Sequence, residues 1–191
     1  MTWKRGHTLD LLEEEHHRIY GSKWALGLDQ KQFLISRGLL PNHHLLDVGC
    51  GAGRAGTQLI PYLDPGHYTG VDGHDSSLSA FEHYEIPLHG LAARQPQLLL
   101  HNIETSPLPL AAAHFDAVLA FSVFNHLTDP AIAARHVARV LKPGGTLFAA
   151  MGPPPCPLDA GLALKETLTV RSLLVPDKEI VWFVFVRQST L

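Results

Sequence analysis

Short apolar runs alternate with longer polar-and-apolar segments over most of this chain, and this alternation restricts its fold more than any other feature. The runs are rich in Leu, Val, Phe and Ala, are bounded by Gly, Asp or Pro, and lie at 44–48, 68–72, 97–101, 115–121, 145–151 and 180–186. Such runs are typical of strands buried on both faces of a sheet. The segments between them, 54–63, 76–84 and 130–141, are predicted to be helices. The pattern predicts an α/β fold: a doubly wound sheet, mostly parallel, with helices on both faces.

The two ends of the chain depart from this pattern. Segments 167–175 and 180–186 are separated by a turn-like sequence that contains Pro176. They predict a C-terminal antiparallel hairpin. Upstream of the first run, helices are expected at 8–20 and 29–37.

The second of these N-terminal helices has recognisable end signals. Asp29 is a candidate N-cap, Gly38 suits the C′ position, and Pro41 prevents continuation. We therefore divide the chain into N-terminal helices at 1–40, a candidate lid over the site, and a core at 41–191. Trp24 lies upstream of the core and belongs either to that lid or to the packing of the N-terminal segment.

Composition excludes several classes of protein. The chain has 191 residues, of which 46% are hydrophobic and 17% charged, and its formal net charge is −3. It can therefore bury a core, and no strong attraction to nucleic acid is expected. Its two cysteines, Cys50 and Cys156, cannot build a disulfide scaffold or a four-cysteine zinc site. With no signal-like or membrane-spanning apolar stretch and no H-E-x-x-H pattern, we expect a cytoplasmic protein without a membrane span or a metal.

The most informative segment is the glycine-rich stretch 45–56, which follows the first run. Gly51, Gly53 and Gly56 complete a G-x-G-x-x-G pattern, which alone is weak support for a dinucleotide site. Asp47 stands two residues before Gly49, where a carboxylate would oppose a pyrophosphate but suit a cationic ligand. A second carboxylate, Asp72, ends the next run, in a position to accept hydrogen bonds from ribose hydroxyls. This combination favours a different nucleoside cofactor.

Four segments carry a resemblance to a known family. Residues 45–53 resemble the cofactor loop of class I S-adenosylmethionine-dependent methyltransferases, of the small single-domain bacterial type. Residues 71–72 resemble that family's acidic turn, 115–118 its fourth strand, and 140–147 its approach to the fifth. They occur in the family's order and cover roughly 43–151. The resemblance implies a Rossmann-like fold and S-adenosyl-L-methionine as cofactor, with S-adenosyl-L-homocysteine as product.

The resemblance also implies roles for individual residues. The loop residues Gly49, Cys50, Gly51 and Gly53 would contact the methionine part of the cofactor. Asp47 would help to orient the ammonium group, although a purely structural role in the loop is an alternative. Gly56 is expected to serve the packing of helix on sheet, and Cys50 to be a small buried residue without nucleophilic chemistry.

The remaining implied contacts lie beyond the second, third and fourth runs. Asp72, with Gly73 beside it, would bind the ribose hydroxyls. Asn102 replaces the Asp that many family members carry, and its amide oxygen can still accept a hydrogen bond from adenine. Ile103 would cover an adenine face. Phe121, with Ser122 beside it, would border the transferable methyl group.

Catalysis needs little from the protein, because the cofactor carries the activated methyl group. His126, just beyond the fourth run, is the candidate base or acceptor-orienting group; the alternative is a structural histidine bonded to backbone. Residues 142–145 (Lys-Pro-Gly-Gly) are expected to form a tight turn.

The leading hypothesis is a methyltransferase acting on a small-molecule acceptor, as a monomer or homodimer. Two alternatives stay open. One is a non-catalytic S-adenosylmethionine-binding partner or sensor domain, and the other is an NAD(P)-binding Rossmann domain. The chain offers no basic stripe with interleaved aromatics, so nucleic acid is not the expected acceptor.

Overall fold

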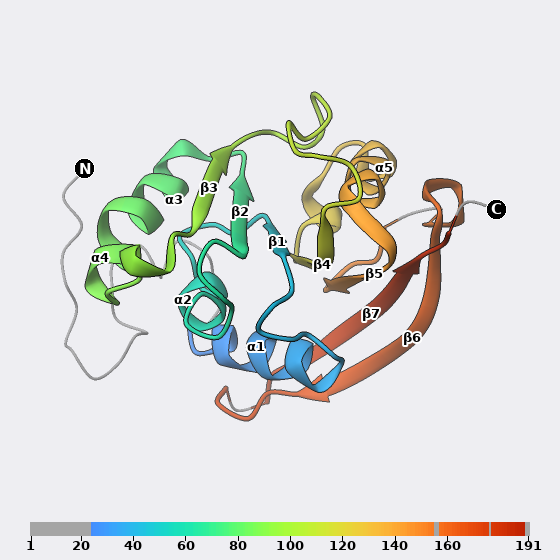
Figure 1. Ribbon diagram of the computed structural model, residues 1–191. Helices are drawn as coiled ribbons and strands as arrows, with labels where there is room; N and C mark the ends of the chain where they lie inside the picture. Colours follow the sequence, from blue (N-terminus) through green and yellow to red (C-terminus); the bar gives the residue numbers. More distant parts are fainter. Residues whose placement is uncertain (1–23, 155–156, 176, 190–191) are drawn as a thin grey trace.

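The computed structural model describes residues 24–154, 157–175 and 177–189. These residues form a seven-stranded sheet in the order β3-β2-β1-β4-β5-β7-β6 (Figure 1). Its strands are β1 Leu45–Val48, β2 Tyr68–Asp72, β3 Gln97–Leu100, β4 Phe115–Phe121, β5 Leu141–Ala150, β6 Leu162–Arg171 and β7 Glu179–Arg187. Strands β1 to β5 pair in parallel, whereas β7 runs antiparallel to both β5 and β6. The predicted doubly wound sheet with a C-terminal antiparallel hairpin is confirmed.

Helices cover both faces of the sheet. The α-helices are α1 Leu26–Ser36, α2 Gly56–Leu59, α3 Asp75–Ala80, α4 Ile86–Leu88 and α5 Pro130–Val140; a π-helical turn spans Phe81–Glu85, and 3-10 turns span Ala92–Arg94, Phe124–His126 and Pro157–Ala160. One buried cluster joins α1, α2 and α3 to one face, and a second joins α5 to the other. Figure 1 shows α5 lying apart from α1, α2 and α3. The helix expected at 8–20 lies outside the described residues.

Two helices differ in length from the prediction, for local reasons. The helix expected at 54–63 is α-helical only over Gly56–Leu59. The left-handed φ of Gly53 (+91°) delays its start, and Pro61 prevents its extension. The helix expected at 76–84 instead continues through the π-helical turn to Leu88. Pro87 has no N–H to donate to the carbonyl of His83, so regular α-helical bonding is interrupted there.

The end signals of α1 were only partly right. The predicted N-cap, Asp29, lies inside the first turn of the helix, and its carboxylate instead accepts a bond from the backbone N–H of Leu173 at 3.2 Å. At the other end the prediction is confirmed: Gly38 has a φ of +99°, and the N–H of Leu39 donates to Leu34 across it.

Strand β5 begins earlier than expected, so residues 142–145, expected to form a tight turn, instead lie inside the strand as an irregularity. Phe115 pairs with Leu141, and Ala117 pairs with Thr146, so the intervening residues of β5 bulge out of the ladder. Gly144, with a φ of +79°, makes this excursion possible. Strand β3, expected to be buried on both faces, is instead an edge strand with Leu100 53% exposed.

The order of the strands fixes where a ligand can enter. The chain moves outward from β1 to β2 and β3, then crosses to the other side of β1 to form β4. In an open α/β sheet, ligands bind beyond the carboxyl ends of the strands at such a switch point. Here the glycine loop after β1 and the segment after β4 meet at that point. No described helix is long and apolar enough to cross a membrane.

Candidate functional site

The glycine loop is held against the tip of β2 by backbone bonds. The N–H groups of Gly49 and Cys50 both donate to the carbonyl of Val71, at 2.8 and 3.1 Å. Gly49 has a φ of +68°, and a Cβ on it would lie 2.7 Å from a methyl of Val123 after β4. A side chain at position 49 would therefore push the tips of β1 and β4 apart.

Two other glycines of the motif serve packing. A Cβ on Gly53 would lie 2.3 Å from the ring of Phe81, and one on Gly56 would lie 2.4 Å from it. The packing role expected for Gly56 is confirmed. Gly53 makes the same kind of close approach, so its ligand contact stays a prediction.

Asp72 fastens the second strand to the loop. One carboxylate oxygen accepts from the N–H of Gly51 and the other from the N–H of His74, both at 2.8 Å. The residue is 9% exposed. A carboxylate oxygen has two lone pairs, so each retains one acceptor position. Asp72 can therefore hold the loop and still accept bonds from a ligand's hydroxyl groups.

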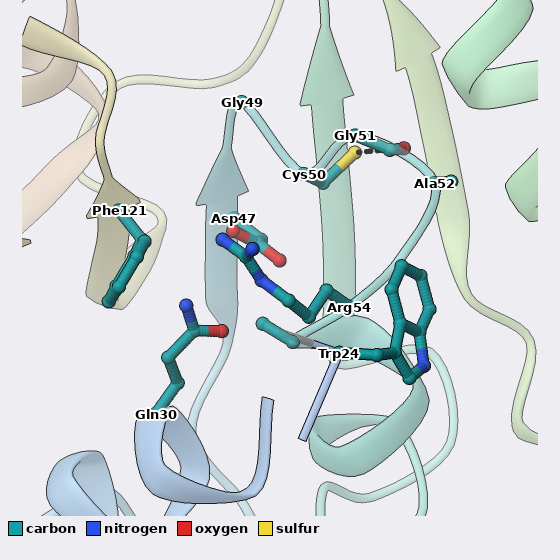
Figure 2. A pocket seen from close by; sticks show the side chains of 10 residues that line it. Trp24, Gln30, Asp47, Gly49, Cys50, Gly51, Ala52, Arg54 and Phe121 are labelled. Carbon is teal, nitrogen blue, oxygen red and sulfur yellow. Dashed lines mark hydrogen bonds between the residues drawn. The ribbon is translucent and has the colours of Figure 1, made fainter. Parts of the chain in front are cut away.

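Beneath the loop lies a cavity of about 50 Å³, shown in Figure 2. Its lining residues come from the N-terminal segment, β1, the glycine loop and β4: Trp24, Gln30, Asp47, Gly49, Cys50, Gly51, Ala52, Arg54, Ala55 and Phe121. Half of these were predicted as ligand contacts from the sequence. A cavity of this size accommodates only a small group, so a nucleoside would lie outside it, over the strand tips.

Asp47 is the buried charge of this cavity. It is 2% exposed, and its carboxylate accepts from the hydroxyl of Tyr68 at 2.7 Å. Burial raises the pKa of Asp47 to about 7, although the Tyr68 bond and the nearby Arg54 charge oppose the shift. The same burial raises the pKa of the Tyr68 hydroxyl well above its ordinary value. A cation that entered the cavity would stabilise the ionised form of Asp47.

Five lining residues were not predicted as ligand contacts: Trp24, Gln30, Ala52, Arg54 and Ala55. Trp24, 3% exposed, lies with Ala52 and Ala80 in a small buried cluster and also lines the cavity, so the structure is compatible with both of its expected roles. The guanidinium of Arg54 lies 5.2 Å from the ring centre of Phe121, a cation–π distance. Gln30 reaches the cavity from α1. Arg54 directly follows the glycine loop, so the sequence could have indicated that it belongs to the site. No feature of the sequence indicates the same for Gln30.

Four other predicted residues lie outside the cavity lining. Gly73 is exposed, near Asn102. The side-chain oxygen of Asn102 accepts from the N–H of Glu104 at 2.9 Å, which leaves one acceptor position on that oxygen. Ile103 is 5% exposed and belongs to the buried cluster on the α5 face. Their contacts with adenine stay predictions.

The fourth predicted residue, His126, is exposed after β4. Its Nε2 lies 3.3 Å from the hydroxyl of Ser122. Ser122 has a φ of +57°, and its N–H donates to Ala150 at the tip of β5. Left-handed backbone at a non-glycine residue is found often at functional sites. The pairing leaves Nδ1 of His126 available to an acceptor.

Cys50 behaves as a buried filler. It is 6% exposed, and its sulfur fits into the space that Gly70 leaves on β2. Burial raises the pKa of its thiol well above the ordinary value, so the nucleophilic thiolate is disfavoured. The described residues contain no cluster of three metal-ligating side chains.

Comparison with known proteins places this arrangement in a family. Residues 46–147, more than half of the chain, match the family model described as a methyltransferase domain. The chain is 34% identical over 104 residues to the O-methyltransferase resE of Aspergillus sclerotiorum, covering 54% of this chain and 38% of that protein. It is 32% identical over 122 residues to a ubiquinone biosynthesis O-methyltransferase of Marinobacter nauticus, covering 61% of this chain and 47% of that protein.

A solved structure shows the same fold. A SAM-dependent methyltransferase from Aquifex aeolicus superimposes with a TM-score of 0.72 at 20% identity, covering 89% of this chain and 96% of that one. The chain spans about half or less of the length of the two curated relatives. The family match falls on the strands and the loop that build the cavity. This chain belongs to the methyltransferase domain family.

Proposed function

We propose that this domain binds S-adenosylmethionine and transfers its methyl group to a hydroxyl of a small-molecule acceptor. The observation that carries the proposal is the pair of carboxylates at the carboxyl tips of β1 and β2, joined by the glycine loop. Asp47 is buried next to a cavity with room for a small cationic group. Asp72 keeps acceptor positions beside the loop. The names of the O-methyltransferase relatives support oxygen as the acceptor atom.

The residues present fit this cofactor at both ends. Position 49 cannot carry a side chain because Val123 is so close, and Gly49 itself is exposed at the tip of β1. Asp72 would accept from the ribose hydroxyls with the oxygen lone pairs that Gly51 and His74 leave unused. Asp47 would accept from the ammonium group, which supplies the cation that its burial requires. When bound, the cofactor supplies an activated methyl group on a sulfonium.

The chain's own residues would then align the acceptor. Phe121 at the tip of β4 lines the cavity and would border the methyl group. His126 would take the proton that the acceptor hydroxyl loses as its oxygen forms the new bond to carbon. General base assistance of this kind typically contributes about 10²–10⁴-fold in rate. Ser122 would hold the ring through Nε2.

We also propose that the segment 1–40 covers the site and that 41–191 form the methyltransferase core. Trp24 and Gln30, which belong to that N-terminal segment, line the cavity beside the loop. Removing the segment would expose Asp47. A monomer or homodimer in the cytoplasm is the accompanying expectation.

Calorimetric titration tests the cofactor, and transfer of a labelled methyl group to a panel of phenols and other hydroxyl compounds tests the reaction. Saturable binding of S-adenosylhomocysteine and turnover are expected, with His126→Gln lowering kcat by about 10²-fold or more. Binding without turnover across the panel would favour the sensor hypothesis. NADH serves as the control ligand: binding of NADH in place of S-adenosylhomocysteine would overturn the proposal.

A further inference from the structure

Gln30 of α1 is a buried polar side chain that the fold does not use. The residue is 1% exposed, and its Oε1 accepts no hydrogen bond from any described residue. Buried amides are almost always hydrogen-bonded, because an unpaired one loses its water without replacement. Phe33 and Leu34 of α1 bury apolar side chains, so an apolar residue at position 30 would serve the packing of this helix equally well.

The place of this amide explains why its oxygen has no partner among the described residues. Gln30 lines the cavity with Asp47 and Arg54. Figure 2 shows its amide extending from α1 toward the space that these two side chains and Phe121 border. A carboxylate, a guanidinium and a neutral amide therefore face one small volume. An α-amino acid group presents the matching set, an ammonium and a carboxylate on adjacent carbons.

We propose that Gln30 is a specificity-determining residue that recognises the amino-acid end of the cofactor. This inference rests on the proposed function. Its amide offers one acceptor, for the ammonium, and two donors, for the carboxylate. The Oε1 of Gln30, which accepts from no described residue, would accept from the ammonium group of the ligand. The protein thereby selects adenosyl ligands that carry an amino-acid end over those that lack it.

Calorimetry with two ligands tests this selection. S-adenosylhomocysteine carries the amino-acid end, whereas 5′-methylthioadenosine shares the adenosine and sulfur but lacks it. Gln30→Leu removes the amide at similar volume and is expected to raise the Kd for S-adenosylhomocysteine about tenfold to 100-fold. The Kd for 5′-methylthioadenosine should change less than about twofold, since that ligand does not reach the amide. Gln32→Leu, the same change at an exposed position of α1, is the matched control and should alter neither Kd.

Thermal unfolding of the ligand-free variants provides a second readout. Replacing an unpaired buried amide by an apolar group of similar shape is neutral or stabilising. Gln30→Leu should therefore keep or raise the Tm while it weakens binding, a combination that a structural role for Gln30 would not give. Equal weakening of both ligands, no weakening of either, or a large fall in Tm would overturn the inference. Failure of the wild-type protein to bind S-adenosylhomocysteine would instead overturn the proposed function.

Discussion

Two aspartates of the same sheet, Asp47 near the carboxyl end of β1 and Asp116 near the amino end of β4, differ in how completely their charges are compensated. The Asp116 carboxylate accepts from the ammonium of Lys142 at 2.7 Å and from the N–H of His44 at 2.9 Å. Burial acts to raise its pKa, but these two bonds outweigh it and hold the pKa below the ordinary value. Asp47 has one neutral donor, Tyr68, and burial raises its pKa to about 7.

The difference separates a structural charge from the charge that we propose binds the cofactor. Asp116 ties the beginnings of β1, β4 and β5 together and needs nothing further. Asp47 lies with Gln30 at the cavity. Asp47 accepts from the neutral Tyr68 hydroxyl, and the Oε1 of Gln30 accepts from no described residue. A fold that leaves polar groups unpaired at one edge of its sheet loses stability there, and such losses are typical of functional sites.

The largest expected effect is the pH dependence that Asp47 imposes on folding. Between pH 3.8 and about 7 the folded protein retains a proton that the unfolded chain releases. The free energy of unfolding should therefore fall as pH rises through this window, by up to roughly 4 kcal/mol from this group. Asp47→Asn should remove that slope. Urea denaturation of both proteins at pH 5 and pH 7.5 samples the upper part of this window, where the wild-type loss should exceed that of Asp47→Asn by roughly 2.5 kcal/mol. Parallel pH profiles would mean that Asp47 is as well compensated as Asp116.

The second largest expected effect is on ligand binding at the carboxyl ends of β1 and β2. Asp72→Ala removes the acceptor of the Gly51 and His74 N–H groups together with the proposed ribose contacts. We expect the affinity for S-adenosylhomocysteine to fall by about 100-fold or more, since charge-assisted bonds of this kind contribute roughly 1.5–3 kcal/mol each. Calorimetry measures the change.

Asp116→Ala is the matched control for this experiment, because it removes a bonded carboxylate from the opposite edge of the same sheet. It should leave the affinity for S-adenosylhomocysteine within about twofold of the wild-type value. If both variants lost affinity equally, the loss would reflect a damaged sheet, and the distinction between the two edges would fail.

Much of this fold follows from the sequence because its strands are short, apolar and bounded by turn residues. The predicted bounds of β2 and β4 agree with the structure. The prediction failed where neighbours in space decide the outcome. Asp29 has the sequence position of a helix cap, yet its partners are Ser172 and Leu173, far along the chain. The π-helical turn before Pro87 likewise extends a helix that periodicity ended at residue 84.

The site divides in the same way. Asp47 and Gly49 were predicted because the glycine loop is a local motif between a strand and a helix, and both line the cavity. Gln30 could not be predicted, because its position on α1 becomes meaningful only when that helix packs beside the loop. Ile103 follows β3 as expected, but its burial on the α5 face comes from tertiary packing that no local pattern reports.

The smallest expected effect is on stability at acid pH. It arises at the amino ends of the strands, where three histidines come together before β1, β2 and β4. The ring of His44 lies 4.0 Å from that of His67 and 4.6 Å from that of His114, between centroids. Partial burial, followed by the charges of these two rings and of Lys142, lowers the pKa of His44, while Asp116 opposes the shift.

A histidine with a lowered pKa binds its proton more weakly in the folded protein than in the unfolded chain. The free energy of unfolding should therefore fall as pH drops below 6.5, opposite in sign to the effect of Asp47. His44→Gln should reduce this loss of stability at acid pH by less than about 1 kcal/mol. The effect is small because the ring is largely solvated and salt screens the neighbouring charges. Comparing the Asp47→Asn protein with the Asp47→Asn/His44→Gln protein removes the contribution of Asp47 from both. Urea denaturation of the two between pH 5 and 7 then measures the contribution of His44 to the free energy of unfolding. A steeper loss of stability at acid pH in the double variant would show that the folded protein stabilises His44 as a cation, and that Asp116 outweighs the neighbouring histidines and Lys142.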